Sequence, residues 1–462
     1  MGSIVFTMRT QAPSALLRYL ALLLLLGGKP LSAAIENSGR LHRRHGRGAD
    51  RNAEPGRVIS WPHSQAADKE PPRTREQRVL VNLLETSNTF AENQDEDPGS
   101  NATSGSAAGR PFPQVFIYEL RQACESVGIY SLERTLPLHL RQTPYYTADI
   151  ASADLFLVPA QPYCNRPEGS VTSAEYIERV LEEEVRPLGR WDALRHRHVW
   201  VFSADHGFCG TGGKGIAGVP AIRDSIILSH WGLTHPENAV QLNQAATRTF
   251  SQPTGPDALP CHVPGKDLVV PPDLNFRALP HGCEGLGQRD IQLLFYGSSG
   301  LGKAHQGLHY SHGVRQAAFL MFGDRSKYPN FRFYESGGTP EDMYRARFCL
   351  APSGGGFGNR LYFIMAHGCI PVIIQPDIAQ PWEELLDYDG FAVVLEQHTM
   401  HRLPRMLDEI ESKTGLLQKM QAEVCRVAPY FSWEWNGARG KAMEALMQVL
   451  ASRIRGKHVT RV

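Results

Sequence analysis

Residues 348–374 have the sequence FCLAPSGGGFGNRLYFIMAHGCIPVII, and this stretch decides the fold class. A short apolar run, Phe348–Ala351, leads into a turn that contains four glycines. A segment of helical length, Asn359–His367, follows, and Gly368 stops it before a second β-rich run, Ile370–Ile374. The order strand, glycine-rich turn, helix, strand predicts one βαβ unit.

The glycine-rich turn is a candidate site for a phosphate or diphosphate. A turn of this kind at the start of a helix leaves bare backbone N–H groups aimed at one point, beside the positive end of the helix dipole. Arg360, in the first helical turn, adds a planar cation suited to phosphate. The turn is not a dinucleotide fingerprint, because Asn359 stands where the third glycine would fall, and no Gly-Lys-Ser/Thr of a P-loop follows. The alternative is that the glycines only let strand and helix pack closely.

Other segments along the chain follow the pattern of one family in the same order. Examples are ADLFLVP at 153–159 and HVWVFSADHG at 198–207. Together with residues 348–373 they resemble the exostosin-type glycosyltransferases, in their plant and algal branch. The resemblance covers roughly residues 112 to 412, and the further matching segments are 115–118, 266–272, 293–297, 313–316 and 381–386.

The predicted fold is α/β. Strand-like runs alternate with helical stretches, which favours mostly parallel sheets. The resemblance implies two Rossmann-like domains of the GT-B type, with the donor nucleotide in the C-terminal half and the acceptor in a cleft between the halves. We expect an acceptor-side domain at 112–260, a nucleotide-sugar domain at 261–412 and helices at 413–462 that pack across both. The expected strands are 114–118, 154–158, 198–203 and 224–229 in the first half, and 268–270, 292–296, 347–351, 370–374 and 391–395 in the second.

The composition is that of a globular enzyme. The formal net charge is +1 at pH 7, and 42% of the residues are hydrophobic. So small a net charge argues against a nucleic-acid partner. At 462 residues the chain is long enough for two cores of typical domain size.

The N-terminus has the features of a targeting segment. Arg9 and Arg18 precede an apolar run, Tyr19–Gly28, which predicts a signal peptide or short signal anchor over residues 1–34. Residues 35–111 are polar and charged, and we expect a disordered stem there. Asn101 begins an N-glycosylation sequon. The body is therefore expected in the secretory lumen, in particular that of the Golgi as a type II membrane protein, or secreted if the signal is cleaved.

The chain has eight cysteines and no CxxC pair, so zinc-ribbon and thioredoxin motifs are unsupported. Their pairing in an oxidising lumen stays open. Cys349 and Cys369 fall on neighbouring predicted strands, where they can also serve as small buried apolar residues.

A sugar transferase has to stabilise a diphosphate leaving group, and backbone N–H groups and arginine suit that task. In the second half, Gly297 and Ser298 follow a strand and are candidates for backbone contact with the diphosphate. Arg315, near the start of a predicted helix, is a second candidate cation, although an arginine there is equally typical of a helix surface. Glu383 or Glu384, a short loop after the run 370–374, is a candidate acceptor for ribose hydroxyls, as a carboxylate after the second strand is in dinucleotide folds. Many family members carry a glutamate inside the helix after the arginine, and its absence here leaves the mode of ribose binding open or moves it to Glu383. The candidate donor-binding residues of the turn are Ser353, Gly355, Gly356, Asn359 and Arg360.

The general base of an inverting reaction must reach the acceptor hydroxyl. Asp205 and His206 follow a strong predicted strand and are the candidates, although an aspartate there is also a common turn former. No metal or other cofactor is expected. The Asp-x-Asp pattern that could hold a metal ion on a diphosphate occurs twice, but Asp95-Glu96-Asp97 lies in the stem and Asp387-Tyr388-Asp389 is predicted to be a turn. His305, His309 and His312 have the spacing of metal ligands on a helix, but glycines interrupt that helix. These histidines are expected to be solvated or to face the acceptor.

The resemblance implies an inverting transferase that moves a hexosyl or pentosyl unit from a nucleotide sugar, a UDP-sugar in particular, to a glycan or polysaccharide acceptor. Partner glycosyltransferases are further candidates for binding. Two alternatives stay open: a glycan-binding pseudoenzyme, which the missing helix glutamate favours, and a sugar-nucleotide hydrolase. The sequence leaves the donor sugar, acceptor and linkage undetermined.

Overall fold

The structure is a computed structural model. All the residues that it describes belong to one compact unit of the chain. The predicted signal segment, the stem with Asn101, and His305 and His309 lie outside the described residues. The structure describes residues 111–121, 124–165, 173–211, 219–234, 261–276, 283, 289–300, 310–336, 338–375, 377–435, 437–456, 459 and 461.

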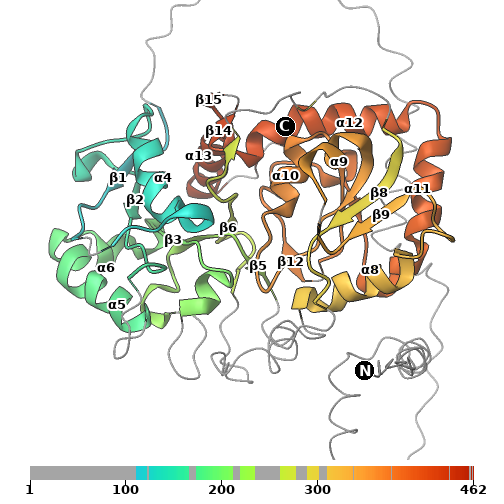
Figure 1. Ribbon diagram of the computed structural model, residues 1–462. Coiled ribbons are helices and arrows are strands. Elements are labelled where there is room, and N and C mark those ends of the chain that lie inside the picture. The colour runs from blue at the N-terminus through green and yellow to red at the C-terminus, as the bar shows by residue number, and fades with distance from the viewer. Residues whose placement is uncertain are drawn as a thin grey trace, which may run out of the picture. The chain divides into compact units, whose positions relative to one another are not determined.

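The first half is built on a five-stranded parallel sheet with the order β1-β2-β3-β4-β6 (Figure 1). Side chains alternate between its two faces, so that Val199 and Val201 of β3 join one core cluster while Trp200 and Phe202 join another. Both faces are therefore covered, as all-parallel sheets require. The strands are β1 (Val115–Ile117), β2 (Leu155–Val158), β3 (His198–Phe202), β4 (Ile226–Ser229) and β6 (Leu268–Val269), and the helices are α4 (Leu132–Arg141), α5 (Ser173–Val180) and α6 (Trp191–Leu194).

The second half is built on another five-stranded parallel sheet, with the order β13-β11-β10-β8-β9. In this sheet β8 comes first along the chain, β9 pairs with one side of it, and β10 then pairs with its other side. This reversal makes a topological switch point between β8 and β10. The strands are β8 (Ile291–Tyr296), β9 (Phe331–Tyr334), β10 (Ala346–Leu350), β11 (Ile370–Ile373) and β13 (Val393–Val394), and the helices are α8 (Val314–Phe322), α9 (Pro340–Arg345) and α10 (Arg360–Ala366).

Short ladders and C-terminal helices complete the described fold. Strand β5 pairs with β12 across the two halves, and β14 pairs with β7 and β15. Leu446, Met447 and Leu450 of the last helix pack against the core of the first sheet. The bounds are β5 (Gly232–Leu233), β7 (Asn275–Phe276), β12 (Ile378–Ala379), β14 (Glu434–Trp435), β15 (Ala438–Arg439), α11 (Leu403–Ser412), α12 (Leu416–Val427) and α13 (Ala442–Ile454).

Two parallel α/β sheets with helices confirm the expected fold class, two Rossmann-like halves of the GT-B type. One strand assignment was wrong. The run 268–270 was expected in the second half, but β6 pairs with β4 of the first, and Val270 N donates to Ser229 O at 2.9 Å. An apolar run shows that a strand forms, but not which sheet it joins. In the part of the chain that the structure describes, no helix is both long and apolar enough to cross a bilayer.

All eight cysteines are paired. The alternative role of Cys349 and Cys369 as unpaired apolar residues was wrong, because their thiols form a disulfide between β10 and β11. Those two strands are hydrogen-bonded neighbours, which brings the two Cα atoms to 5.9 Å. The other disulfides are Cys124–Cys164, Cys209–Cys261 and Cys283–Cys425.

Candidate active site

The glycine-rich turn lies at the carboxyl end of β10, and Gly297 lies at the carboxyl end of β8. These are the two strands that flank the switch point, and ligands of open α/β sheets bind in the crevice outside such strand ends. Helix α10 begins at Arg360, directly after the turn, as the sequence predicts. The topology thus places the predicted turn at the expected binding edge of the second sheet.

Arg315 of α8 is buried beneath the turn. Its Nε donates to the carbonyl oxygen of Ser353 at 2.9 Å, and an Nη donates to the carbonyl oxygen of Ser298 at 3.2 Å. The guanidinium also lies over the ring of Tyr310, 4.8 Å from the centroid. Only 6% of Arg315 is exposed, and burial lowers the pKa of its side chain. The alternative role of this arginine, a residue on a helix surface, is therefore wrong.

Arg360 brings a second guanidinium to the same place. It lies 4.8 Å from the ring centroid of Phe295 and 5.0 Å from that of Tyr296. Gly297 makes room for it, because a Cβ at that position would lie 2.5 Å from an Arg360 Nη, and its φ of +140° also favours glycine. Burial, and then the nearby charge of Arg315, lower the pKa of Arg360 to about 10.

Among the described residues no carboxylate pairs with either guanidinium group, although Arg315 is buried and Arg360 is half-buried. Arg360 Nε is buried and makes no hydrogen bond within the described part of the chain. A buried cation without an anion is costly. This pair is therefore suited to an anionic ligand that supplies the missing charge and acceptors.

The backbone of the turn contributes less than the sequence suggests. Gly354 N donates to Gly356 O at 3.1 Å, and Phe357 N donates to Asp205 O at 2.8 Å, so these two N–H groups are already used. Helix α10 has seven residues, which leaves it a weak dipole. Neither of these two N–H groups is therefore available to a ligand, and the arginines carry most of the positive charge of the site. The donor-binding roles of Ser353, Gly355, Gly356 and Asn359 stay predictions.

The first half contributes Asp205, which follows β3. Besides the backbone bond to Phe357, its carboxylate Oδ1 accepts a hydrogen bond from the Tyr130 hydroxyl at 2.9 Å. A Cβ on Gly356 would lie 2.0 Å from the carbonyl oxygen of Asp205, so only glycine allows this approach. Asp205 is exposed, which leaves its carboxylate accessible to a ligand.

His206 lies beside Trp231, with ring centroids 6.3 Å apart, and Trp231 in turn packs at 5.8 Å against His312 of the second half. Burial, and then the nearby His206, lower the pKa of His312 to about 4, so this ring is neutral at pH 7. His312 is half-buried rather than fully solvated, and the alternative expectation, that it faces the acceptor, stays a prediction. Ser311 and His312 both have positive φ, 55° and 54°, a strained backbone within a short helical turn.

Glu383 and Glu384 line a different feature, a pocket of about 340 Å³. Glu384 forms an ion pair with Arg453 of α13. Gln375, which also lines the pocket, donates through Nε2 to the carbonyl oxygen of Ala351 at 2.8 Å, directly behind the turn. The pocket therefore adjoins the turn through one side chain, and the role of the two glutamates stays a prediction.

The structure thus brings most of the predicted residues to one place, and their roles remain predictions. No group of three or more histidine, cysteine, aspartate or glutamate residues able to hold a metal ion occurs among the described residues. Sequence reasoning missed Tyr130, Phe295, Tyr310 and Trp231. The aromatic residues that end β8 were visible only as strand formers. The gathered predicted residues are Gly297, Ser298, Arg315, Ser353, Gly355, Gly356, Asn359 and Arg360, with Asp205 opposite.

Known proteins resemble this chain over most of the described part. It is 25% identical over 294 residues to a probable glucuronoxylan glucuronosyltransferase of Arabidopsis thaliana, an alignment that covers 61% of this chain and 58% of the relative. It is 26% identical to a probable glucuronosyltransferase of Oryza sativa, covering 66% and 72%. A probable beta-1,4-xylosyltransferase of Arabidopsis thaliana is 24% identical, covering 64% and 71%.

The chain therefore spans less than two thirds of the length of the first of these relatives, and rather more of the other two. The exostosin GT47 domain matches residues 110–410, which is more than half of the chain. This agrees with the order of motifs in the sequence and with the two parallel sheets. The chain belongs to the exostosin GT47 family of glycosyltransferases.

Proposed function

We propose that this protein is an inverting glycosyltransferase that moves a sugar from a UDP-sugar to a glycan acceptor in the lumen of the secretory pathway. The observation that carries the proposal is the pair of guanidinium groups at the switch point of the second sheet, those of buried Arg315 and half-buried Arg360. A diphosphate provides the negative charge and the acceptor oxygens that this pair is suited to bind.

The reaction has one displacement at the anomeric carbon. The bond from that carbon to the diphosphate oxygen breaks as a bond to the acceptor oxygen forms on the opposite face, which inverts the configuration. Negative charge grows on the leaving diphosphate, where Arg315 and Arg360 stabilise it. The acceptor hydroxyl proton passes to a base, and Asp205 is the leading candidate, with His206 as the other.

The pocket beside Gln375 is the proposed location for the ribose of the donor. Glu383 and Glu384 line it, and carboxylate oxygens accept hydrogen bonds from a pair of sugar hydroxyls. Its volume, about 340 Å³, is within the range of small-molecule sites, roughly 300–1,000 Å³. The hydrogen bond from Gln375 to Ala351 shows that this pocket adjoins the strand that leads into the turn, which supports the proposed location.

A donor screen tests the proposal. Purified full-length protein is incubated with UDP-glucuronic acid, UDP-xylose, UDP-galactose or UDP-arabinose, with and without xylo-oligosaccharides, and UDP release and product anomers are measured. The names of the relatives make glucuronic acid and xylose the first donors to try. Acceptor-dependent transfer with inverted configuration is expected. Equal UDP release without acceptor would assign a hydrolase, and glycan binding with no turnover would assign a pseudoenzyme.

The luminal location is supported by the four disulfides, because such bonds persist in oxidising compartments. In cells that express the full chain, Asn101 is expected to carry a glycan removable by endoglycosidase, and the body is expected to be protected from protease added outside sealed Golgi vesicles. A cytosolic chain with unmodified Asn101 and free thiols would contradict the location. An Asn101→Gln variant controls for glycans at other positions.

A further inference from the structure

Tyr130 is the described side chain that holds the carboxylate of Asp205. Its hydroxyl donates to Asp205 Oδ1 at 2.9 Å, across 75 residues of sequence. Burial, and then the charge of Asp205, raise the pKa of Tyr130 above its ordinary value. The phenol therefore stays protonated at neutral pH, and it acts toward this carboxylate as a hydrogen-bond donor.

The ring of Tyr130 is itself fixed on several sides. It stacks on Tyr163, with ring centroids 4.0 Å apart and planes 23° from parallel. Phe357 of the glycine-rich turn meets it edge-on at 6.2 Å. The backbone carbonyl oxygen of Tyr130 accepts a hydrogen bond from Ser203 Oγ at 2.8 Å. A side chain held in this way can fix the orientation of the group it contacts, since little rotational freedom is left to lose.

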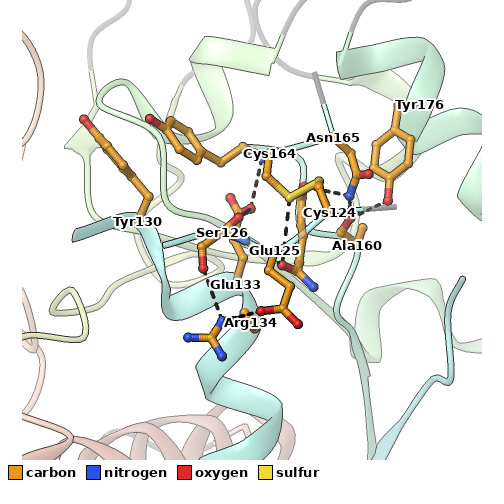
Figure 2. The surroundings of a disulfide bond; sticks show 12 residues. Cys124, Glu125, Ser126, Tyr130, Glu133, Arg134, Ala160, Cys164, Asn165 and Tyr176 are labelled. Carbon is orange, nitrogen blue, oxygen red and sulfur yellow. Dashed lines mark hydrogen bonds and ion pairs between the residues drawn. A yellow bond between two sulfur atoms is a disulfide. The ribbon is translucent and has the colours of Figure 1, made fainter. Parts of the chain in front are cut away.

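A buried carboxyl group behind Tyr130, that of Glu133, connects these parts. Glu133, only 1% exposed, accepts hydrogen bonds from Ser203 N at 2.9 Å, Tyr163 N at 2.9 Å and Ser126 Oγ at 3.1 Å. Ser203 leads into Asp205, and Tyr163 carries the stack under Tyr130. Figure 2 shows Tyr130, Ser126 and Glu133 close to the Cys124–Cys164 disulfide, whose second cysteine directly follows Tyr163. The two loops that the disulfide joins therefore both contact the carboxyl group of Glu133.

We propose that Tyr130 is a positioning residue that orients the carboxylate of Asp205 for proton abstraction from the acceptor hydroxyl. The inference rests on the proposed function, in which Asp205 is the base. One carboxylate oxygen is held by the phenol, and rotation of the carboxylate is restricted, so the group is placed before the acceptor arrives. Errors of about 1 Å in such placement can cost about a hundredfold in rate.

The test is a kinetic cycle with Tyr130→Phe, Asp205→Asn and the double variant, assayed with the UDP-sugar that the donor screen identifies. Phenylalanine keeps the stack on Tyr163 and removes only the hydroxyl. Tyr176→Phe is the matched control, because its hydroxyl also makes a buried hydrogen bond in the first half, to Ala160 O, away from Asp205 (Figure 2). Melting temperature, kcat, donor KM and the affinity for UDP alone are measured for each variant.

Tyr130→Phe is expected to lower kcat by about ten- to a hundredfold while donor KM and UDP affinity stay within about twofold. In the Asp205→Asn background it should have no further effect on kcat, because a residue that acts only through Asp205 has nothing left to orient. Tyr176→Phe should lower the melting temperature without changing kcat.

The outcomes separate the two proposals. If Asp205→Asn lowers turnover but Tyr130→Phe leaves kcat unchanged, the positioning role falls and the base assignment stands. The positioning role also falls if Tyr130→Phe lowers kcat equally in both backgrounds. If Asp205→Asn keeps full turnover, the base assignment falls and the inference falls with it, as it does if the parent turns over no donor.

Discussion

Phe357 donates its backbone N–H to the carbonyl oxygen of Asp205 at 2.8 Å, and this bond joins the glycine-rich turn of one half to the strand-end loop of the other. It places the proposed base and the proposed diphosphate site on the same connection. The proposed donor and acceptor groups therefore lie together at the carboxyl ends of the two sheets. Neighbouring Gly356 is the residue that allows so close an approach.

Gly356→Ala should break this connection. The new Cβ would lie 2.0 Å from Asp205 O, a backbone atom that cannot rotate away, so the turn has to move. We expect a loss of about 1–3 kcal/mol of unfolding free energy and a fall in turnover. Urea denaturation measures the first effect. Gly355→Ala is the stability control, because its Cβ would meet only Tyr310 at an ordinary 4.0 Å. Equal stability of the two variants would contradict the contact.

The turn and its helix were predictable from the sequence because their signals are local. Glycines, apolar runs and the stop at Gly368 all act within 27 residues, 348–374, and the structure has α10 at Arg360–Ala366. Gly415, with φ of +76°, separates α11 from α12 near the start of the expected C-terminal helices.

The remainder of the site depends on contacts that no local pattern encodes. Tyr130 meets Asp205 across 75 residues, and Glu133 meets Ser203 across 70. Neither Tyr130 nor Glu133 belongs to a recognisable motif in its own segment of the sequence. Arg315 was a candidate only through its place in a family pattern, and its burial follows from the order of β8, β9 and β10, which a sequence of strand-like runs does not specify.

Arg360→Met should weaken UDP binding without destabilising the fold. Charge-assisted hydrogen bonds contribute roughly 1.5–3 kcal/mol, so the Kd for UDP should rise by roughly ten- to a hundredfold. Methionine still packs on Phe295 and Tyr296 and removes a buried charge, so the melting temperature should stay or rise. Isothermal titration with UDP and thermal denaturation measure the two effects.

The matched control for that variant is Arg345→Met, which removes an exposed arginine of the same half that pairs with Asp290 at 2.6 Å. Its UDP affinity should equal that of the parent. If Arg360→Met binds UDP as tightly as the parent does, the diphosphate lies elsewhere.

Activity should persist in excess EDTA. The proposed charge on the leaving diphosphate is stabilised by Arg315 and Arg360, two groups that chelation does not remove. UDP release is measured after dialysis against EDTA and again after addition of Mn²⁺ or Mg²⁺. Rates within about twofold are expected. Complete loss on chelation with recovery on Mn²⁺ would assign the charge stabilisation to a metal ion instead.

Glu133 should make stability depend on pH. Burial raises the pKa of this carboxyl from 4.5 to about 7, although three donors bind it. The folded state then holds a proton that the unfolded state releases, so this stabilisation is complete below pH 4.5 and is lost as pH rises through 7. A pKa raised from 4.5 to about 7 corresponds to about 3 kcal/mol.

Urea denaturation at pH 5 and at pH 7.5 tests this dependence. The parent should lose stability at the higher pH, whereas Glu133→Gln, which cannot titrate, should lose less by about 2 kcal/mol, the part of the linkage that falls between these two pH values. The amide of glutamine cannot accept all three hydrogen bonds, so this variant should also be less stable than the parent at pH 5. Glu182→Gln, at an exposed pair with Arg186, should follow the parent. An identical pH dependence in the parent and Glu133→Gln would show that the buried carboxyl is ionised throughout this range, held by Ser203, Tyr163 and Ser126 rather than by a proton.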